Sequence, residues 1–174
     1  IATILHRVLD KNYYNESDFF FHDNYYWCFE HHGVHAQINL NDYIKSSNEI
    51  IDFAFDYLKN CSVLIITFGT SYVYSFGNKV VANCHKQPSN TFNSFNLSID
   101  DITNDYDILI QKLIIINPAI QIIFTVSPVR YISQGIVANN LSKSILKIAS
   151  HNLTQKFDNV HYFPAFEYVI DILR

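Results

Sequence analysis

The chain has 174 residues, of which 49% are hydrophobic and 16% aromatic, with only four Gly and four Pro. This length fits one domain with its own core, and this composition is too apolar for disorder. A net charge of −4 without any cluster of Lys or Arg argues against a dedicated nucleic-acid or membrane-surface binder. The three cysteines are scattered, which indicates a reducing compartment, the cytoplasm by default, rather than a disulfide framework.

No stretch of the sequence is apolar over the length of about 20 residues that a membrane span needs. The most apolar stretch, residues 113–129, is interrupted by polar residues and a proline. The chain opens at Ile1 inside an apolar pattern, contains no Met, and stops at Arg174 within a helical pattern. We therefore expect a piece of a longer protein, incomplete at both ends.

The first two expected helices flank an apolar strand. Asn41 is a plausible N-cap for the first helix, and the strand follows at residues 62–68. Ser98 and Asp101 have the spacing of a capping box for the second helix, which ends before Pro118. The apolar stripe of the first helix comprises Ile44, Ile51, Phe55 and Leu58.

Two further strands are expected at residues 121–126 and 160–163, each followed by a helix. The helix between these strands is expected to begin at Asn140, and the last helix at Pro164. The strands at 62–68 and 121–126 are nearly continuous in apolar residues, as strands buried on both faces should be. Alternating strands and helices predict an α/β fold with a parallel sheet and right-handed crossovers. The inward stripe of the helix at Asn140 is expected to be Leu141, Ile145, Ala149, Leu153 and Phe157.

Three polar or turn-forming segments follow the three strands directly, at residues 69–72, 127–130 and 164–167. Open parallel sheets bind ligands outside the carboxyl ends of their strands. These segments are therefore expected to share one site.

Five motifs stand out along the chain: VLIITFGTSYVY at 63–74, VVANCHKQP at 80–88, IIFTVSPVR at 122–130, the Asn140–Lys143 segment, and HYFPAFE at 161–167. In the order and spacing of these motifs the sequence resembles the GSCFA-domain family. Residues 26–32 are similar to that family's aromatic–S–F–x–H–H segment. The resemblance covers nearly the whole chain.

The resemblance implies a fold and a reaction. The family is similar to SGNH (GDSL-like) hydrolases, which implies a flavodoxin-like three-layer α/β/α sandwich with a serine nucleophile and a histidine base. The G-S-C-F-A motif and the late H-P-S type segment are both absent from this chain. The resemblance therefore places nucleophile and base outside these residues. It also exposes a departure, because Gly69-Thr70-Ser71 stands where SGNH enzymes carry a G-x-N asparagine.

Candidate residues of an oxyanion site come from two loops. Gly69, Thr70 and Ser71 either help to hold an oxyanion or form an ordinary strand-to-loop turn. Ser71 is less favoured as the nucleophile. His85 either faces the site, as the resemblance favours, or bonds a backbone carbonyl, and Asn83 is a candidate for the missing amide donor.

Further candidates for substrate binding are His31, Lys86, Arg130, Asn140, Lys143 and Glu167. His31 belongs to an adjacent pair of histidines, for which a structural role is the commoner explanation. Arg130 either binds an anion or forms an ion pair with a carboxylate such as Glu167. Asn140 is explained equally well as a helix cap, Lys143 as a solvated side chain, and Glu167 as a first-turn carboxylate.

We expect a serine ester hydrolase or acyl-transfer domain of the SGNH kind, acting on a small or carbohydrate ester. The alternative is a non-catalytic module that binds a glycan or small anion at the same edge. A zinc site formed by Cys28, His31, Cys84 and His85 is a third and remote alternative, because no ligand spacing supports it. No metal or other cofactor, nucleic acid or membrane partner is expected, and the sequence leaves the oligomeric state open.

Overall fold

The computed structural model describes residues 1–173. Within it the chain divides into two compact units. Unit 1 comprises residues 1–59 and 74–95, and unit 2 comprises residues 60–73 and 96–174. Each unit has its own sheet and its own buried residues, so each is described by itself.

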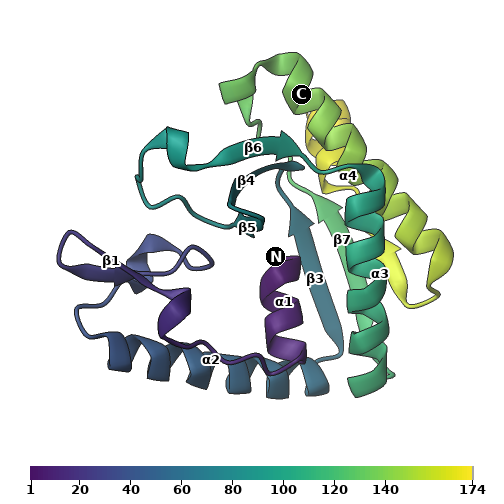
Figure 1. Cartoon of the computed structure of the whole chain (residues 1–174). Coiled ribbons are helices and arrows are strands. Elements are labelled where there is room, and N and C mark those ends of the chain that lie inside the picture. The colour runs from purple at the N-terminus through teal and green to yellow at the C-terminus, as the bar shows by residue number, and fades with distance from the viewer. Residues whose placement is uncertain (174) are drawn as a thin grey trace. The chain divides into compact units, whose positions relative to one another are not determined.

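Unit 2 contains the predicted parallel sheet (Figure 1). Its strands are β3 (Val63–Phe68), β7 (Gln121–Val126) and β8 (Val160–Tyr162), in the order β3-β7-β8. Both pairings are parallel, so the three carboxyl ends point the same way. The predictions of three strands and of a parallel sheet are therefore confirmed.

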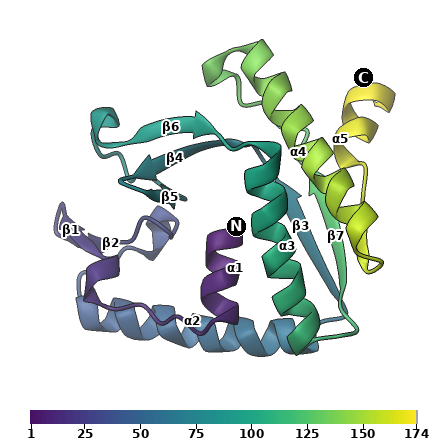
Figure 2. The same cartoon turned by 45° about the vertical axis from the view of Figure 1, so that its right-hand side comes forward.

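Helices flank this sheet in unit 2. They are α3 (Ile99–Ile116), α4 (Ile136–Lys156) and the short α5 (Ala165–Glu167), which continues as a π-helical turn, η5 (Tyr168–Ile172). A 3-10 turn, η4 (Ile132–Gln134), precedes α4. The α3 and α4 helices lie side by side along the sheet, as Figure 2 shows. Ser98 and Asp101 form the predicted capping box at the start of α3.

The core of unit 2 lies between the middle strand and these helices. Phe124 and Val126 of β7 are fully buried, as are Leu109 and Leu113 of α3. On β3, however, Ile65 is 63% exposed. The strands at 62–68 and 121–126 were both predicted to be buried on both faces. This prediction holds for the middle strand β7 and is wrong for β3, which presents one face to solvent.

The α4 helix differs from its prediction in where it starts and in which residues its first turns bury. It begins at Ile136 after Gly135, so Asn140 lies inside the helix and caps nothing. Leu141 is 54% exposed, whereas its neighbours Ser142 and Lys143 are buried. Further along the helix Ala149 and Leu153 are fully buried, as predicted. The inward stripe is therefore wrong only at its start, where polar side chains of α4 bond the strand ends.

Unit 1 has less regular structure. It contains α1 (Ala2–Leu9), α2 (Leu40–Asn60) and the hairpin of β1 (Phe20–His22) with β2 (Tyr25–Trp27). A second sheet has the order β5-β4-β6, formed by β4 (Tyr72–Phe76), β5 (Lys79–Val81) and β6 (Asn93–Asn96). Three 3-10 turns complete the unit: η1 (Glu16–Asp18), η2 (Gly33–His35) and η3 (Ser89–Thr91). Both β4 and β6 carry the chain across the boundary between the units.

The start of α2 corrects another expectation. The Asn39 side chain accepts hydrogen bonds from the backbone N–H groups of Asn41 and Asp42, so Asn39 is the capping residue and Asn41 lies in the first turn. None of the helices among the described residues has the length and apolar character needed to cross a membrane.

Candidate functional site

The ends of two parallel strands meet at one lysine in unit 2. The ammonium group of Lys143 on α4 donates hydrogen bonds to the carbonyl oxygens of Gly69, just after β3, and Ser127, just after β7. The Nζ–O distance to Ser127 is 2.7 Å. The expected convergence of the loops after positions 68 and 126 is therefore present, and Lys143 is the residue that joins them.

Lys143 is a buried cation. Its residue is only 2% exposed, and no carboxylate among the described residues forms an ion pair with it. Burial lowers the pKa of Lys143 below its ordinary value. Its other close neighbour is the ring of Tyr131, whose centroid lies 5.4 Å from Nζ. The alternative in which Lys143 is a solvated side chain is therefore wrong. Its positive charge lies at the strand ends, where two backbone carbonyl groups stabilise it.

The hydroxyl of Ser142, also on α4, holds the Gly69–Ser71 turn in place. The Ser142 hydroxyl accepts the backbone N–H of Ser71 at 2.7 Å and shares a hydrogen bond of 2.9 Å with the Thr70 hydroxyl. The Gly69 carbonyl faces Lys143, and the planar trans peptide directs the Thr70 N–H the opposite way. Consecutive residues of α4 thus fix the orientation of this turn.

Sequence reasoning missed Asn96. The fully buried Ser71 donates its hydroxyl hydrogen to Asn96 Oδ1 at 3.0 Å. This bond occupies the acceptor end of the amide and leaves Asn96 Nδ2 as a donor on an exposed residue beside the turn. No sequence signal links positions 71 and 96. Only the approach of the end of β6 to the start of β4 brings them together.

Gly69 has a packing reason to be glycine. A Cβ atom added at this position would lie 3.2 Å from the Tyr131 hydroxyl oxygen. Tyr131 itself is held by Asn139, whose Oδ1 accepts the Tyr131 backbone N–H at 2.8 Å. The turn is therefore tightly enclosed on the side of Tyr131.

The other candidates in unit 2 lie outside this cluster. Arg130 is exposed, and its alternative as an ion pair with Glu167 is wrong: Glu167 instead pairs with Lys147 at 3.6 Å and accepts the Tyr162 hydroxyl. Asn140 is exposed on α4. A substrate-binding role for these residues stays a prediction.

Asn83, His85 and Lys86 belong to unit 1. His85 is buried, its Nε2 lies 2.7 Å from the carbonyl oxygen of Cys28, and its ring packs on Trp27. Asn83 Oδ1 accepts the His85 backbone N–H. Both His85 and the exposed Lys86 have positive φ angles, of 48° and 57°. This geometry matches the alternative in which His85 bonds a backbone carbonyl, while a site role for these residues stays untested.

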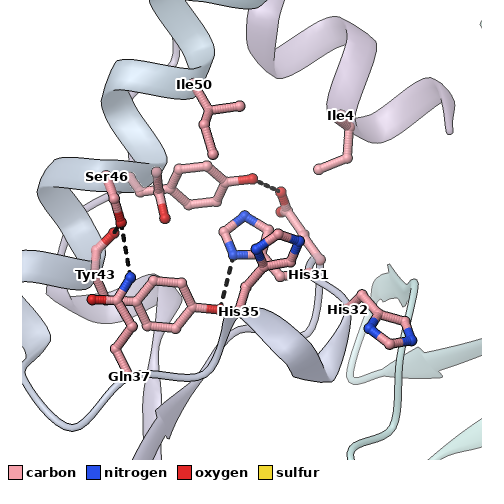
Figure 3. A pocket seen from close by; sticks show the side chains of 11 residues that line it. Ile4, His31, His32, His35, Gln37, Tyr43, Ser46 and Ile50 are labelled. Atoms are coloured by element: carbon pink, nitrogen blue, oxygen red, sulfur yellow. Dashed lines mark hydrogen bonds between the residues drawn. The ribbon is translucent and has the colours of Figure 1, made fainter.

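Unit 1 also contains a pocket of about 300 Å³ around His31 (Figure 3). We call it the His31 pocket. Its lining residues come from α1, the segment between α1 and η1, residues 30–37, and α2: Ile4, Tyr14, Glu30, His31, His32, His35, Gln37, Tyr43, Ser46, Ser47 and Ile50. His31 Nδ1 lies 3.0 Å from the Tyr43 hydroxyl, and the His32 ring is set apart from this pair. The adjacent histidines thus have different surroundings, as expected for an extended segment.

The electrostatics of the pocket keep His31 neutral. Burial lowers its pKa to about 4, and the nearby His35 and Arg7 act in the same direction against an opposing effect of Glu30. We expect the free energy of unfolding to fall by about 2 kcal/mol as the pH drops from 6.5 toward 4, because only the unfolded chain takes up this proton in that range. Urea unfolding at several pH values measures this effect. A His31→Gln variant should lack that part of the slope, and an unchanged slope would contradict the assignment.

The zinc alternative finds no ligand set. Within residues 1–173, no three His, Cys, Asp or Glu side chains group as a metal-ion site. Burial also raises the pKa of the Cys28 thiol to about 11, which opposes the thiolate form that binds metals. None of Cys28, Cys61 and Cys84 forms a disulfide bond.

The fold and this cluster define a mixed α/β protein with a polar site at the carboxyl edge of a parallel sheet. The chain belongs to the GSCFA family, whose model matches residues 1–174. The resemblance found in the motifs is therefore confirmed. No curated protein and no solved structure matches the chain.

Proposed function

We propose that this chain forms the oxyanion-binding part of a serine ester hydrolase or acyl-transfer domain of the SGNH kind, acting on a small or carbohydrate ester. The proposal includes a flavodoxin-like sandwich, with nucleophilic serine and base histidine outside these residues. The observation that carries it is the buried Lys143 cation, which holds the ends of β3 and β7 together without a carboxylate partner. A positive charge in a dry environment stabilises negative charge that develops nearby in a reaction.

Two donors in unit 2 are suited to an oxyanion. The Thr70 N–H faces away from Lys143, and Asn96 Nδ2 is left as a donor by the Ser71 bond. Backbone and side-chain amides of this kind supply oxyanion holes in acyl-transfer enzymes. Asn96 would thus take the role of the asparagine that the G-x-N position lacks.

The hydroxyls of the turn argue against a nucleophile within it. Ser71 donates to Asn96, and Ser142 is bonded to Thr70 and to the Ser71 N–H. The rings of His31, His85 and His161 bond a tyrosine hydroxyl, a backbone carbonyl and a glutamine side chain, and none of these three bonds involves a serine. This observation favours the second candidate, a module that binds a glycan or small anion without catalysis.

The 174-residue chain alone is expected to hydrolyse p-nitrophenyl acetate at the background rate, because it supplies neither nucleophile nor base. The release of p-nitrophenolate measures this. If the chain turns over the ester and Ser71→Ala abolishes the activity, the serine lies within the chain and the proposed division of roles is wrong.

A longer polypeptide that carries these residues provides the positive test. There, Asn96→Ala is expected to lower kcat for an ester about 100-fold, as loss of an oxyanion donor does. The matched control is Asn93→Ala, an exposed asparagine of the same strand that should leave kcat unchanged. Failure of that polypeptide to react with a fluorophosphonate or to cleave esters would favour the binding module.

A further inference from the structure

The His31 pocket has the size of a small-ligand site and lies within one unit. Its volume of about 300 Å³ is at the lower end of the range for such sites. The walls are largely aromatic and aliphatic. Tyr14 and Tyr43 are buried to 4% and 2% exposure, and the His31 ring packs edge-on against Tyr14 with a centroid distance of 4.8 Å. Ile4 and Ile50 lie at the other side of the pocket in Figure 3.

The one carboxylate of the pocket is already paired, so it leaves no free negative charge that would select a cation. Glu30, the one carboxylate of the lining, receives two hydrogen bonds from the Arg7 guanidinium, at 2.8 and 2.9 Å, and a third from the Tyr14 hydroxyl. His31 is neutral near pH 7 because burial lowers its pKa to about 4. The pocket therefore favours an uncharged ligand.

The neutral His31 ring is set up for hydrogen bonding to such a ligand. Its Nδ1 is occupied by the Tyr43 hydroxyl, and no residue among 1–173 bonds its Nε2. If the Tyr43 hydroxyl donates to Nδ1, Nε2 carries the ring hydrogen and donates to the ligand. If Nδ1 donates to Tyr43, Nε2 accepts a hydrogen bond from the ligand. Gln37 and Ser46, which bond each other at 3.0 Å, place an amide and a hydroxyl in the same lining.

Aromatic faces together with uncharged donors and acceptors match one class of ligand. A sugar ring offers C–H faces that pack on aromatic rings and hydroxyl groups that both donate and accept hydrogen bonds. We propose that the His31 pocket binds a single uncharged sugar residue, with His31 Nε2 as a hydrogen-bond partner positioned by Tyr43. This inference rests on unit 1 alone and does not depend on the ester chemistry proposed for unit 2.

The test is saturation-transfer NMR on the 174-residue chain with methyl glucoside, methyl galactoside, N-acetylglucosamine and glucuronate as probes at millimolar concentration. At least one neutral sugar is expected to receive saturation, and glucuronate to receive less, because Arg7, which could bind its carboxylate, is already paired with Glu30. The absence of transfer to every neutral probe would overturn the proposal, as would a preference for glucuronate.

Variants locate the binding. Tyr43→Phe removes the hydroxyl that orients His31 and is expected to weaken the best neutral sugar about tenfold, the effect of one lost hydrogen bond. Tyr25→Phe is the matched control, because Tyr25 is an exposed tyrosine of the same unit outside the pocket.

Ile50→Trp provides a second variant that leaves the buried hydrogen bonds intact. Ile50 is 57% exposed in the lining, so the larger side chain should fill the pocket and abolish transfer without unfolding the chain. Phe53→Trp, 74% exposed on α2 and outside the pocket, should leave it unchanged. Transfer that persists in both Ile50→Trp and Tyr43→Phe would place the sugar elsewhere and refute the inference.

Discussion

Replacing Lys143 with Met is expected to lower the free energy of unfolding of unit 2 by about 3 kcal/mol. The substitution keeps an unbranched side chain at this buried position but removes both hydrogen bonds to the carbonyl oxygens of Gly69 and Ser127. Each bond from a charged donor contributes about 1.5–3 kcal/mol, and unpaired buried carbonyls add a further penalty. The relief from burying a charge offsets only part of this loss. Urea unfolding followed by far-UV circular dichroism measures the difference.

Lys147→Met is the matched control for this experiment. It lies one turn further along α4, is 38% exposed, and pairs with Glu167 at the surface, so its loss should change the free energy by less than about 1 kcal/mol. If Lys143→Met proves as stable as the parent chain, Lys143 does not hold the strand ends together.

The pH dependence gives a second measurement on Lys143. Burial lowers its pKa in the folded state below the ordinary 10.5, so the unfolded chain binds this proton more tightly. The free energy of unfolding therefore rises with pH between the folded-state pKa and 10.5. This contribution should be missing in Lys143→Met and present in Lys147→Met.

The parallel sheet could be predicted from sequence because its signal is local. Uninterrupted apolar runs at 63–68 and 121–126 lie between helical patterns, and the Ser98 capping box marks a helix start. Each of these features depends on residues within one turn or one strand. They can therefore be recognised without knowledge of any tertiary contact.

The site was harder to predict because its residues violate local rules. Hydrophobic periodicity places Leu141 inward, whereas α4 buries Ser142 and Lys143 to bond the strand ends. The Ser71–Asn96 bond joins a turn residue to the last residue of β6, and a single sequence does not show that these two positions meet. Local patterns fail at the positions where polar groups satisfy distant backbone atoms.

The α2 helix of unit 1 was predicted, but the β1–β2 hairpin of this unit was not, because its strands are short. The turn between β1 and β2 is formed by Asp23 and Asn24, both with positive φ, and such a pair between aromatic runs is a recognisable hairpin signal. The strands themselves have three residues each, too few for an alternating pattern to stand out.

Replacing Arg7 with Met is expected to have the largest effect of all, about 4 kcal/mol on the free energy of unfolding of unit 1. Arg7 is 9% exposed and bonds Glu30 through Nε and Nη2, Asp18 through Nη2, and the Asn12 carbonyl through Nη1. Removing one member of a buried ion pair leaves the other charge uncompensated, which costs about 3–5 kcal/mol. Burial alone would lower the pKa of Arg7, but Glu30 raises it above its ordinary value, so the guanidinium stays charged.

The fluorescence of Trp27 gives a clean measurement, because this residue is the single tryptophan and lies in unit 1. Its unfolding transition in urea should move to lower denaturant in Arg7→Met. Lys11→Met is the matched control: the Lys11–Asp52 pair spans 3.3 Å, but its side chains are 44% and 52% exposed, so the transition should hardly move.

The double variant Arg7→Met/Glu30→Gln separates two causes of the lost stability, the missing packing of Arg7 and the uncompensated charge of Glu30. If the uncompensated carboxylate dominates, neutralising Glu30 restores most of the stability, although Arg7 also packs over the Tyr14 ring at 4.0 Å. Equal transitions for Arg7→Met and Lys11→Met would contradict this account. Arg7 joins α1 to η1 and to the segment before His31. In unit 1 a few charge-assisted hydrogen bonds thus hold distant segments of the chain together, a role that the continuous β3–β7 pairing has in unit 2.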